Sequence, residues 1–379
     1  MGRIVSVEQS PDVVTVEIES VGRRRFHAMW LRDNSLDATT RSSTNGQRLV
    51  TINDIDPTTS VTGCERSNDG TSITVTFAPC GTSATFTADW LERHAYDVER
   101  PAQKGWLPPT IETWTSSITA ARLPRASWTT LSDEDAILHT WLDGVRRMGV
   151  GIVTDLPTTP GFLCTFARRF GYVRETNYGE YFEVRSEVTP SNLAYTNLGL
   201  QAHTDNPYRD PVPTMQILAC LENSVDGGES TVVDAFAVAQ ALRDSSPEHF
   251  ELLTSHPVRF AYEGTSDVSL HAKRPIIELG PDGELLAVRF NNRSAAPFRD
   301  VPFDVMPAFY DAYRAFAELV DDPRFAVEFK LAPGEAFIVD NVRVLHARRA
   351  FSGSGRRWLQ GCYVDRDGLE STLRVLEGR

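Results

Sequence analysis

Cysteine is scarce in this sequence, and its arrangement excludes two kinds of covalent framework. The 379 residues include five cysteines, and no two of them form a CxxC pair. An odd number of scattered cysteines in a long chain argues against a disulfide framework and against a cluster of metal-binding thiolates. We therefore expect free thiols that are buried or partly buried.

Long apolar runs are also missing. No stretch approaches the roughly 20 apolar residues that a membrane-spanning helix needs. The first residues, from Met1 to Val5, lack the apolar segment of a signal peptide. These absences predict a cytoplasmic protein without a membrane partner.

Basic residues are in the minority. The chain has 38 Lys and Arg residues against 51 Asp and Glu residues, and its formal net charge is -13. Such a chain is repelled at long range by nucleic acid and by anionic membranes. We therefore expect a small-molecule substrate rather than a nucleic-acid partner, and any anion that binds must meet a local cationic pocket.

The composition is that of an ordinary globular protein, and its length suggests two domains. Apolar and polar residues alternate at strand period in residues 13–18, 25–30 and 73–77, which predicts a small β-rich domain over residues 1–100. Residues 101–127 are rich in Pro, Ser and Thr without a sustained period, which predicts a linker.

The second domain, residues 128–379, is expected to begin with a helix. Residues 132–135 have the pattern of a capping box, and apolar residues follow at helical spacing until Gly149. Short β-rich runs and helical segments come after it, which predicts a β-core decorated by helices. The runs are residues 152–154, 215–218, 287–290, 336–339 and 358–363, and the helical segments are residues 161–170, 235–254 and 307–319.

Two His-x-acid triplets occur, and their contexts differ. His249 and Glu251 follow Ser-Ser-Pro, which favours a helix start, where side chains two apart diverge. His203 and Asp205 lie at a plausible strand end, where side chains two apart share a face. Two imidazoles and a carboxylate on one side of a metal are the ligands of non-haem Fe(II) oxygenases, so a distant histidine should complete this set.

His346 is the strongest candidate for that third ligand, because an apolar strand and a polar turn lead to it. Arg357 follows it at the start of another apolar run. A guanidinium pairs with a carboxylate bidentately, so Arg357 is suited to the far carboxylate of 2-oxoglutarate. Arg356 is the alternative, since the two neighbours on a strand point to opposite faces.

These motifs resemble the γ-butyrobetaine hydroxylase-like branch of the taurine-dioxygenase superfamily, which includes 2-(trimethylamino)ethylphosphonate dioxygenases. The resemblance covers nearly the whole chain. It is carried by residues 30–34, 90–94, 203–209, 227–230 and 346–367.

The resemblance implies a fold that is mainly β with flanking helices: a double-stranded β-helix (jelly-roll) catalytic domain plus a small β-rich N-terminal domain. It also implies Fe(II) on His203, Asp205 and His346, 2-oxoglutarate on Arg357, O₂ as the oxidant, and a homodimer.

The chain departs from this family at one site. The N-terminal domain of the family commonly holds a zinc on three cysteines and a histidine. Here Ser35, Asp37 and Thr40 stand at the thiolate positions, and only His94 matches. Hydroxyls and one carboxylate cannot replace three thiolates around a tetrahedral zinc, so we expect no structural zinc.

The family binds a quaternary ammonium group in an aromatic cage, which cation–π attraction favours. The matching residues are Tyr178, Phe182 and Tyr363, with Tyr195 nearby. Glu180 or Glu183 could instead turn inward and bind a primary amine. Donors for an acidic substrate group are expected among Asn192, Asn206, Arg209, Arg289, Asn291, Asn292 and Arg293.

The motifs predict an Fe(II)/2-oxoglutarate dioxygenase, and the family resemblance implies that it oxidises a C–H bond of a small quaternary-ammonium carboxylate or phosphonate. The intact Asp205 argues against a halogenase. The alternatives are a same-fold oxygenase that hydroxylates, desaturates or rearranges an amino acid or natural-product intermediate, an inactive metal-binding jelly roll, and an unrelated zinc hydrolase.

Overall fold

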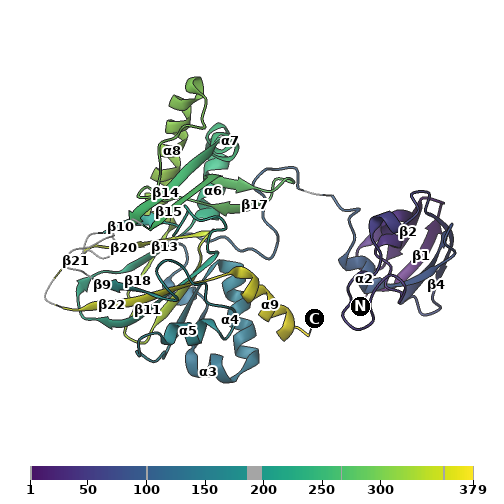
Figure 1. Cartoon of the computed structure of the whole chain (residues 1–379), viewed down its shortest axis with the longest axis horizontal. Helices are drawn as coiled ribbons and strands as arrows, with labels where there is room; N and C mark the ends of the chain where they lie inside the picture. Colours follow the sequence, from purple (N-terminus) through teal and green to yellow (C-terminus); the bar gives the residue numbers. More distant parts are fainter. Residues whose placement is uncertain (1, 100, 186–198, 266, 353–354, 379) are drawn as a thin grey trace. The chain divides into compact units, whose positions relative to one another are not determined.

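The computed structural model describes residues 2–99, 101–185, 199–265, 267–352 and 355–378 (Figure 1). It divides into two compact units, Met1–Pro101 and Ala102–Arg379. Residues 102–127, predicted as a linker, pack within the second unit: Trp106 Nε1 donates to the Asp282 carbonyl at 3.1 Å, and the buried Trp114 donates to the Met148 carbonyl at 2.7 Å.

The first unit consists of two small antiparallel sheets, each followed by a short helix. Its core forms because alternate residues of the strands face inward, as Val14, Val16 and Ile18 do. The predicted strand over residues 25–30 was wrong in its second half, because Ala28 and Leu31 bury themselves at helical spacing. The elements are β1 (Ile4–Gln9), β2 (Val13–Ile18), β3 (Gly22–His27), α1 (Ala28–Asp33), β4 (Ser60–Arg66), β5 (Ser72–Ala78), β6 (Ser83–Thr87) and α2 (Ala88–Arg93).

Two sheets form the β-core of the second unit, which is the predicted jelly roll. Their strands pair antiparallel, apart from the parallel pair β7 and β8. The larger sheet has the order β7 (Arg125–Ser127), β8 (Val150–Thr154), β19 (Ala336–Asp340), β11 (Met215–Asn223), β22 (Arg357–Val364), β9 (Phe182–Arg185), and the smaller has the order β10 (Leu200–His203), β20 (Val344–Arg348), β13 (Ser230–Asp234), β18 (Ala326–Phe329).

The alternation of side chains along these strands separates two layers of core. On β11, Met215 and Ile217 pack against helices, whereas Leu218 and Cys220 belong to the cluster that joins the two sheets. Both faces of this strand are therefore buried, which explains why its sequence is apolar throughout rather than alternating.

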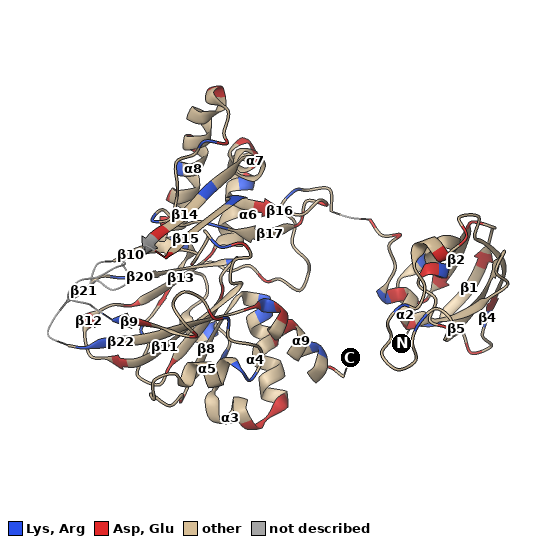
Figure 2. Cartoon of the chain, in the orientation of Figure 1, with Lys and Arg blue, Asp and Glu red and all other residues tan. Residues whose placement is uncertain are grey.

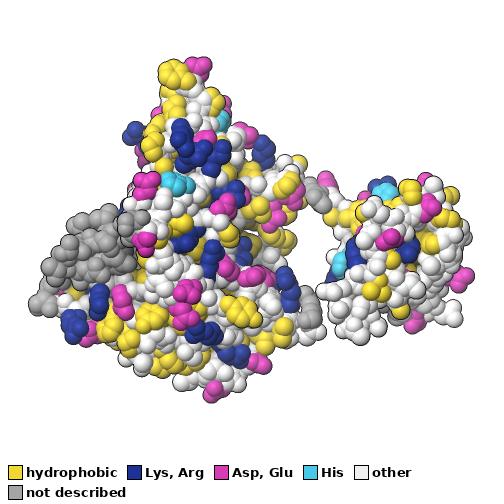
Figure 3. All heavy atoms as spheres, in the orientation of Figure 1, with side chains coloured by type: hydrophobic (Ala, Val, Ile, Leu, Met, Phe, Trp, Pro, Cys, Tyr) yellow, Lys and Arg dark blue, Asp and Glu magenta, His cyan; other side chains and the backbone are white. Residues whose placement is uncertain are grey.

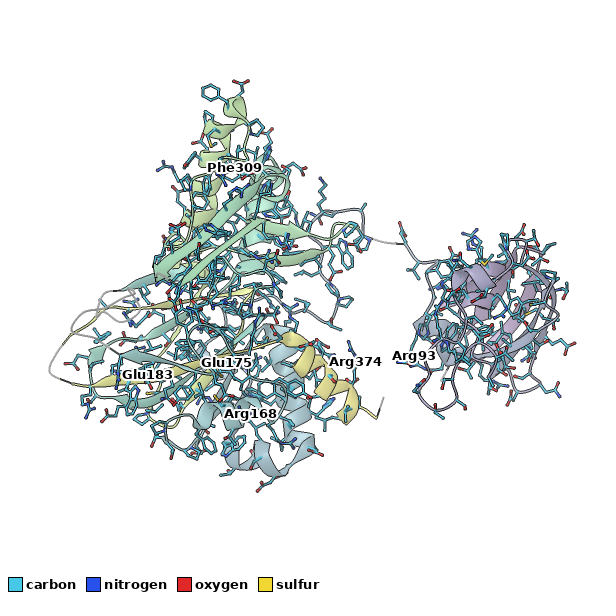
Figure 4. The ribbon with its side chains drawn as sticks, viewed as in Figure 1. Arg93, Arg168, Glu175, Glu183, Phe309 and Arg374 are labelled. Atoms are coloured by element: carbon cyan, nitrogen blue, oxygen red, sulfur yellow. The ribbon has the colours of Figure 1, made fainter. Side chains whose placement is uncertain are left out.

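Helices cover the outer sides of both sheets, as Figure 1 shows for the second unit. One group packs on the larger sheet, and the other packs beyond the smaller sheet, where Phe309 of α8 is fully buried (Figure 4). The first group is α3 (Trp128–Asp133), α4 (Asp135–Met148), α5 (Phe162–Ala167) and α9 (Arg366–Leu376); the second is α6 (Ala235–Ser245), α7 (Pro247–Ser255) and α8 (Met306–Asp321).

Further strands of the second unit lie outside these two sheets. They form three two-stranded sheets. These are β14 (Pro257–Thr265) with β15 (Val268–Pro275), β16 (Ile277–Leu279) with β17 (Leu285–Val288), and β12 (Asp226–Gly227) with β21 (Phe351–Ser352).

The predicted start of the first helix was wrong, while its end is confirmed. Ser132 lies inside α3 and donates to the Thr129 carbonyl, so it caps nothing, and α4 begins only at Asp135. Gly149 ends α4 with φ 73°, a left-handed conformation that glycine adopts readily. The predicted helix over residues 235–254 is two helices, because Pro247 interrupts the backbone hydrogen bonds and starts α7.

No helix in the described part of the chain is both long and apolar enough to cross a bilayer. Acidic and basic side chains are interspersed along both units (Figure 2), and both signs are scattered over the face shown in Figure 3. All five cysteines are free thiols. Four of them are buried or partly buried, as predicted, whereas the prediction was wrong for Cys80, which is exposed.

Candidate functional site

Two histidines face each other across neighbouring strands. β10 pairs antiparallel with β20 so that His203 lies directly opposite His346, with ring centroids 4.4 Å apart. His203 Nδ1 donates to the Gln201 carbonyl at 2.7 Å, so its Nε2 keeps a lone pair for a ligand. Both side chains are buried. The predicted strand end at His203 is confirmed.

Asp205 completes this group, although it lies beyond the strand rather than on it. The buried Asn341 side chain accepts from the Asp205 backbone N–H at 2.7 Å and donates to the Asp205 carbonyl at 2.9 Å. Asp205 Oδ1 thereby lies 3.2 Å from His203 Nε2 and 4.0 Å from His346 Nε2.

The electrostatics of these three residues suit a cation. Burial and the neighbouring His203 lower the pKa of His346 to about 3, so its imidazole is neutral at pH 7. Burial acts to raise the pKa of Asp205, but the close contact with His203 and nearby positive charges outweigh burial and hold this pKa below its ordinary value. An ionised Asp205 carboxylate therefore faces a neutral His346 imidazole.

Among the described residues, this is the one cluster of His, Cys, Asp or Glu whose ligand atoms could hold a metal together, within 4.8 Å of one another. Its donor atoms fit Fe(II), because two imidazoles and a carboxylate leave coordination positions open for other ligands. His249, from the rival triplet, lies in helix α7 as predicted and takes no part.

The cluster opens into a cavity of ≈ 370 Å³, which we call the central cavity. Cavities of this size hold small ligands rather than polymers. The lining includes Tyr178, Phe182, His203, Asp205, Asn206, Tyr208, Gln216, Ser230, Tyr262, Glu263, Asn291, Arg293, His346, Arg348, Arg357 and Tyr363.

Arg357 and Arg356 have opposite surroundings. Arg357 is 8% exposed, lines the central cavity, and has no ion pair among the described residues; burial lowers its pKa. Arg356 is exposed and pairs with Glu222 at 3.2 Å. A second cation lines the cavity beside Arg357: burial and the like charge of Arg357 lower the pKa of Arg348 to about 10.

Three of the four predicted cage aromatics meet in the cavity. Phe182 stacks on Tyr363 with centroids 5.2 Å apart, and Tyr178 lies 6.1 Å from Phe182. Burial and the Asp205 charge raise the pKa of Tyr363 well above its ordinary value, so its hydroxyl keeps its proton. Tyr195 lies outside the described residues.

Only some of the residues predicted to contact the acidic group of the substrate line the central cavity. Asn206 lines the cavity, is 4% exposed, and its Nδ2 has no hydrogen-bond partner among the described residues. Arg289 pairs with Glu278, and Asn292 bonds Gln201 and Tyr313, so neither lines the central cavity.

Three other predicted donors also differ in their position relative to the central cavity. Asn192 lies outside the described residues. Arg293 lines the central cavity, whereas Arg209 bonds Asn177 and does not.

The two glutamates predicted as an alternative amine site have other partners. Glu180 pairs with Arg168 at 2.7 Å, and Glu183 accepts from Gln360 Nε2 at 2.9 Å and from Trp358 Nε1. Neither lines the central cavity.

Several lining residues were not predicted. Tyr262 stacks on Tyr208 with centroids 5.1 Å apart and brings Glu263 with it from β14. The sequence could have indicated Gln216, since it is a polar residue inside an otherwise apolar strand. No sequence feature indicates Tyr262 or Glu263, because they reach the cavity only when a distant hairpin folds back onto it.

The residues that match the zinc-binding positions of the family have hydrogen-bond partners within the first unit. The buried Arg32 donates to Thr40 Oγ1 at 2.8 Å, Thr40 donates to Asp37 at 2.8 Å, and Ser35 donates to the Leu31 carbonyl at 3.1 Å. His94 is exposed and stacks on Trp90. A guanidinium therefore lies among these groups, and they do not fit a zinc ion.

Comparison with known proteins gives extended matches. The family model "Taurine catabolism dioxygenase TauD, TfdA family" matches residues 110–363. The chain is 36% identical over 354 residues to gamma-butyrobetaine dioxygenase of Pseudomonas sp. (strain AK-1), covering 93% of this chain and 90% of that protein.

Two further relatives are similar over almost the same length. The gamma-butyrobetaine dioxygenase of Homo sapiens is 30% identical over 360 residues, which are 93% of this chain and 92% of that protein. The mitochondrial trimethyllysine dioxygenase of Bos taurus is 31% identical over 361 residues, which are 93% of this chain and 83% of that protein. Matches of this extent confirm that the chain belongs to the taurine catabolism dioxygenase TauD, TfdA family, in its γ-butyrobetaine hydroxylase-like branch, and is a 2-oxoglutarate-dependent dioxygenase.

Proposed function

We propose that this dioxygenase oxidises an unactivated C–H bond, most simply by hydroxylation, in a small acid that carries a quaternary ammonium group. Suitable substrates are γ-butyrobetaine and 2-(trimethylamino)ethylphosphonate. One observation carries the proposal: the His203, Asp205 and His346 cluster opens into a small cavity with several aromatic rings and the buried Arg357, which has no ion pair in the described part of the chain.

The proposed Fe(II) ligands are His203 Nε2, Asp205 Oδ1 and His346 Nε2. The chemistry that Fe(II) supplies when bound is activation of O₂ for oxidation of a C–H bond, while 2-oxoglutarate becomes succinate and CO₂. The protein's own part is to hold the three ligand atoms together and to exclude water from a buried site.

Arg357 is the proposed partner of the far carboxylate of 2-oxoglutarate. A buried guanidinium without an ion pair carries an uncompensated desolvation cost, which an anionic ligand removes. The planar guanidinium also fixes the direction in which the co-substrate reaches the metal ligands.

The substrate cation is proposed to lie against Tyr178, Phe182 and Tyr363, with Tyr208 and Tyr262 enlarging the aromatic surface. A quaternary ammonium group is weakly hydrated, so rings compensate for the water that it loses. The acidic end is proposed to accept from Asn206 Nδ2, which has no partner in the ranges that the structure describes, with Arg293 supplying charge.

A turnover screen tests this proposal. Succinate release is measured with Fe(II), 2-oxoglutarate and quaternary amines that end in a carboxylate or a phosphonate. We expect release above the substrate-free rate with at least one of these compounds. Release that no such compound stimulates would contradict the proposal.

A same-fold oxygenase acting on a primary amine is the second candidate, because Glu263 also lines the cavity. Its carboxylate is largely exposed and lies 3.5 Å from His271 Nε2. The two candidates differ in their response to methylation, since rings cannot replace the hydrogen bonds of a primary ammonium. Turnover that falls with each methyl removed supports the quaternary substrate, and the reverse order supports Glu263.

We also propose that the first unit contains no structural zinc, because the Arg32, Asp37 and Thr40 network already satisfies the polar groups at that position. Assembly as a homodimer and a cytoplasmic location are proposals from the family resemblance and the composition. Light scattering and cell fractionation test these two proposals directly.

A further inference from the structure

Two side chains from neighbouring strands bind the same oxygen of Asp205. Gln216 of β11 and Tyr363 of β22 are direct partners across the strand pair, and both face the central cavity. Gln216 Nε2 donates to Asp205 Oδ2 at 2.7 Å, and the Tyr363 hydroxyl donates to it at 2.9 Å. The two donors are 1% and 4% exposed, so water competes little with them.

The other oxygen of Asp205 faces the histidines. Oδ1 lies 3.2 Å from His203 Nε2 and 4.0 Å from His346 Nε2. With Oδ2 engaged by two donors, the carboxylate cannot rotate without breaking both hydrogen bonds. A ligand that offers one oxygen leaves coordination positions for co-substrate and O₂.

A packed ring holds Tyr363 in place. Phe182 stacks on it with an interplanar angle of 28° and covers Gly361, its partner in the strand pair. A Cβ on Gly361 would lie 2.3 Å from Phe182 Cζ, so glycine is required for the ring to reach this position. The order Gly361, Phe182, Tyr363, Asp205 is thus one continuous contact path.

We propose that Tyr363 and Gln216 are positioning residues that orient Asp205 so that Oδ1 alone serves as the metal ligand. The inference deepens the proposed function and rests on its assignment of Fe(II) to His203, Asp205 and His346. Tyr363 then acts through its hydroxyl as well as through its ring, whereas the sequence indicated only an aromatic wall.

Removal of the hydroxyl separates these two roles. Tyr363→Phe keeps the ring and its stack on Phe182 but deletes the donor, and Gln216→Leu deletes the second donor. Tyr178→Phe is the matched control, because the Tyr178 hydroxyl bonds Tyr208 and not Asp205. Asp205→Ala reports whether the metal depends on this carboxylate at all.

The measurement is an anaerobic Fe(II) titration of the full chain without substrate or co-substrate, so that the cage plays no part. Changes around metal ligands typically weaken metal binding about 10- to 100-fold. We expect a loss in this range for Tyr363→Phe and for Gln216→Leu, a larger loss for the double variant, and wild-type affinity for Tyr178→Phe.

The outcomes distinguish the inference from the proposed function. If Asp205→Ala loses Fe(II) while both donor variants keep wild-type affinity, the positioning role is wrong and the metal site stands. If Asp205→Ala itself keeps wild-type affinity, both are overturned. Should Gln216→Leu fail to fold, Tyr363→Phe decides alone, with the ratio of succinate to oxidised product as a second readout that rises if the ligand is misoriented.

Discussion

Arg356 and Arg357 are consecutive residues that differ in burial and in ion pairing. Loss of a charge-assisted pair with a buried guanidinium weakens binding by about 2–3 kcal/mol, which is roughly 30- to 150-fold. We expect this loss of 2-oxoglutarate affinity in Arg357→Ala, with Fe(II) affinity little changed. Arg356→Ala is the control, since Arg356 is exposed and pairs with Glu222.

The measurement is an anaerobic titration of 2-oxoglutarate into each variant loaded with Fe(II). If Arg356→Ala loses the affinity and Arg357→Ala keeps it, the co-substrate assignment moves to the other arginine.

The cysteines should differ in reactivity, because only the thiolate is nucleophilic. For Cys80, desolvation acts to raise the pKa, but hydrogen bonding to Thr82 and the nearby Arg32 outweigh this effect and lower the pKa. Burial instead raises the pKa of Cys64 and of Cys220 to about 11. A lowered pKa means more thiolate at pH 8 than an ordinary cysteine has. We expect iodoacetamide to label Cys80 first, as measured by peptide mass spectrometry; equal labelling of Cys220 would contradict the environments described.

At the scale of elements, the pairing of β22 with β9 depends on Gly361. Added bulk in a packed core costs about 1–3 kcal/mol, and an alanine Cβ here would overlap the Phe182 ring and approach Leu218 to 2.9 Å. We therefore expect Gly361→Ala to lower the free energy of unfolding of the second unit by about this amount.

Gly171→Ala is the control in the same unit, because its nearest contact would be an ordinary 3.6 Å. Thermal unfolding compares the two variants. Equal melting temperatures would show that Phe182 moves away without loss of stability. The packing of Phe182 on Gly361 would then not be what holds Tyr363 in place.

Elements with a strong period could be predicted, whereas only some of their ends could. The strand that ends at His203 and the left-handed stop at Gly149 follow from local chemistry. The start of α4 does not, because Ser132 joins a separate short helix instead. Asp205 was predicted as a ligand from strand geometry, yet Asn341 holds it in place from a distant turn.

At the scale of the whole molecule, the proposal that the first unit contains no zinc requires other contacts to hold its loop in place. Burial of Arg32 with Thr40 and Asp37 is expected to contribute about 1–3 kcal/mol. We expect Arg32→Met to destabilise this unit by that amount, while Arg23→Met stays within about 0.5 kcal/mol, since Arg23 forms an exposed pair with Glu8.

A chelator is expected to leave the unfolding of the first unit unchanged, and elemental analysis is expected to find no zinc after the active-site metal has been removed. One tightly held zinc per chain would contradict this interpretation.

The residues proposed to bind the metal and the co-substrate could be predicted from the sequence, but the other residues that line the cavity could be predicted only in part. His203, Asp205, His346 and Arg357 have local signatures, and the fold brings them to one cavity. Tyr262 has no such signature, since it arrives from a hairpin whose position depends on packing far along the chain. Arg289 was assigned to the substrate from its place in the sequence, but its ion pair with Glu278 directs it elsewhere.

The central claim is that His203, Asp205 and His346 hold Fe(II) together with 2-oxoglutarate in one cavity. Its most direct test is the visible charge-transfer absorption that appears when Fe(II) and 2-oxoglutarate are added to the protein without O₂. The account predicts this band in the wild-type chain and its loss in His203→Ala, Asp205→Ala and His346→Ala. A wild-type chain without the band, or variants that all retain it, would contradict the account.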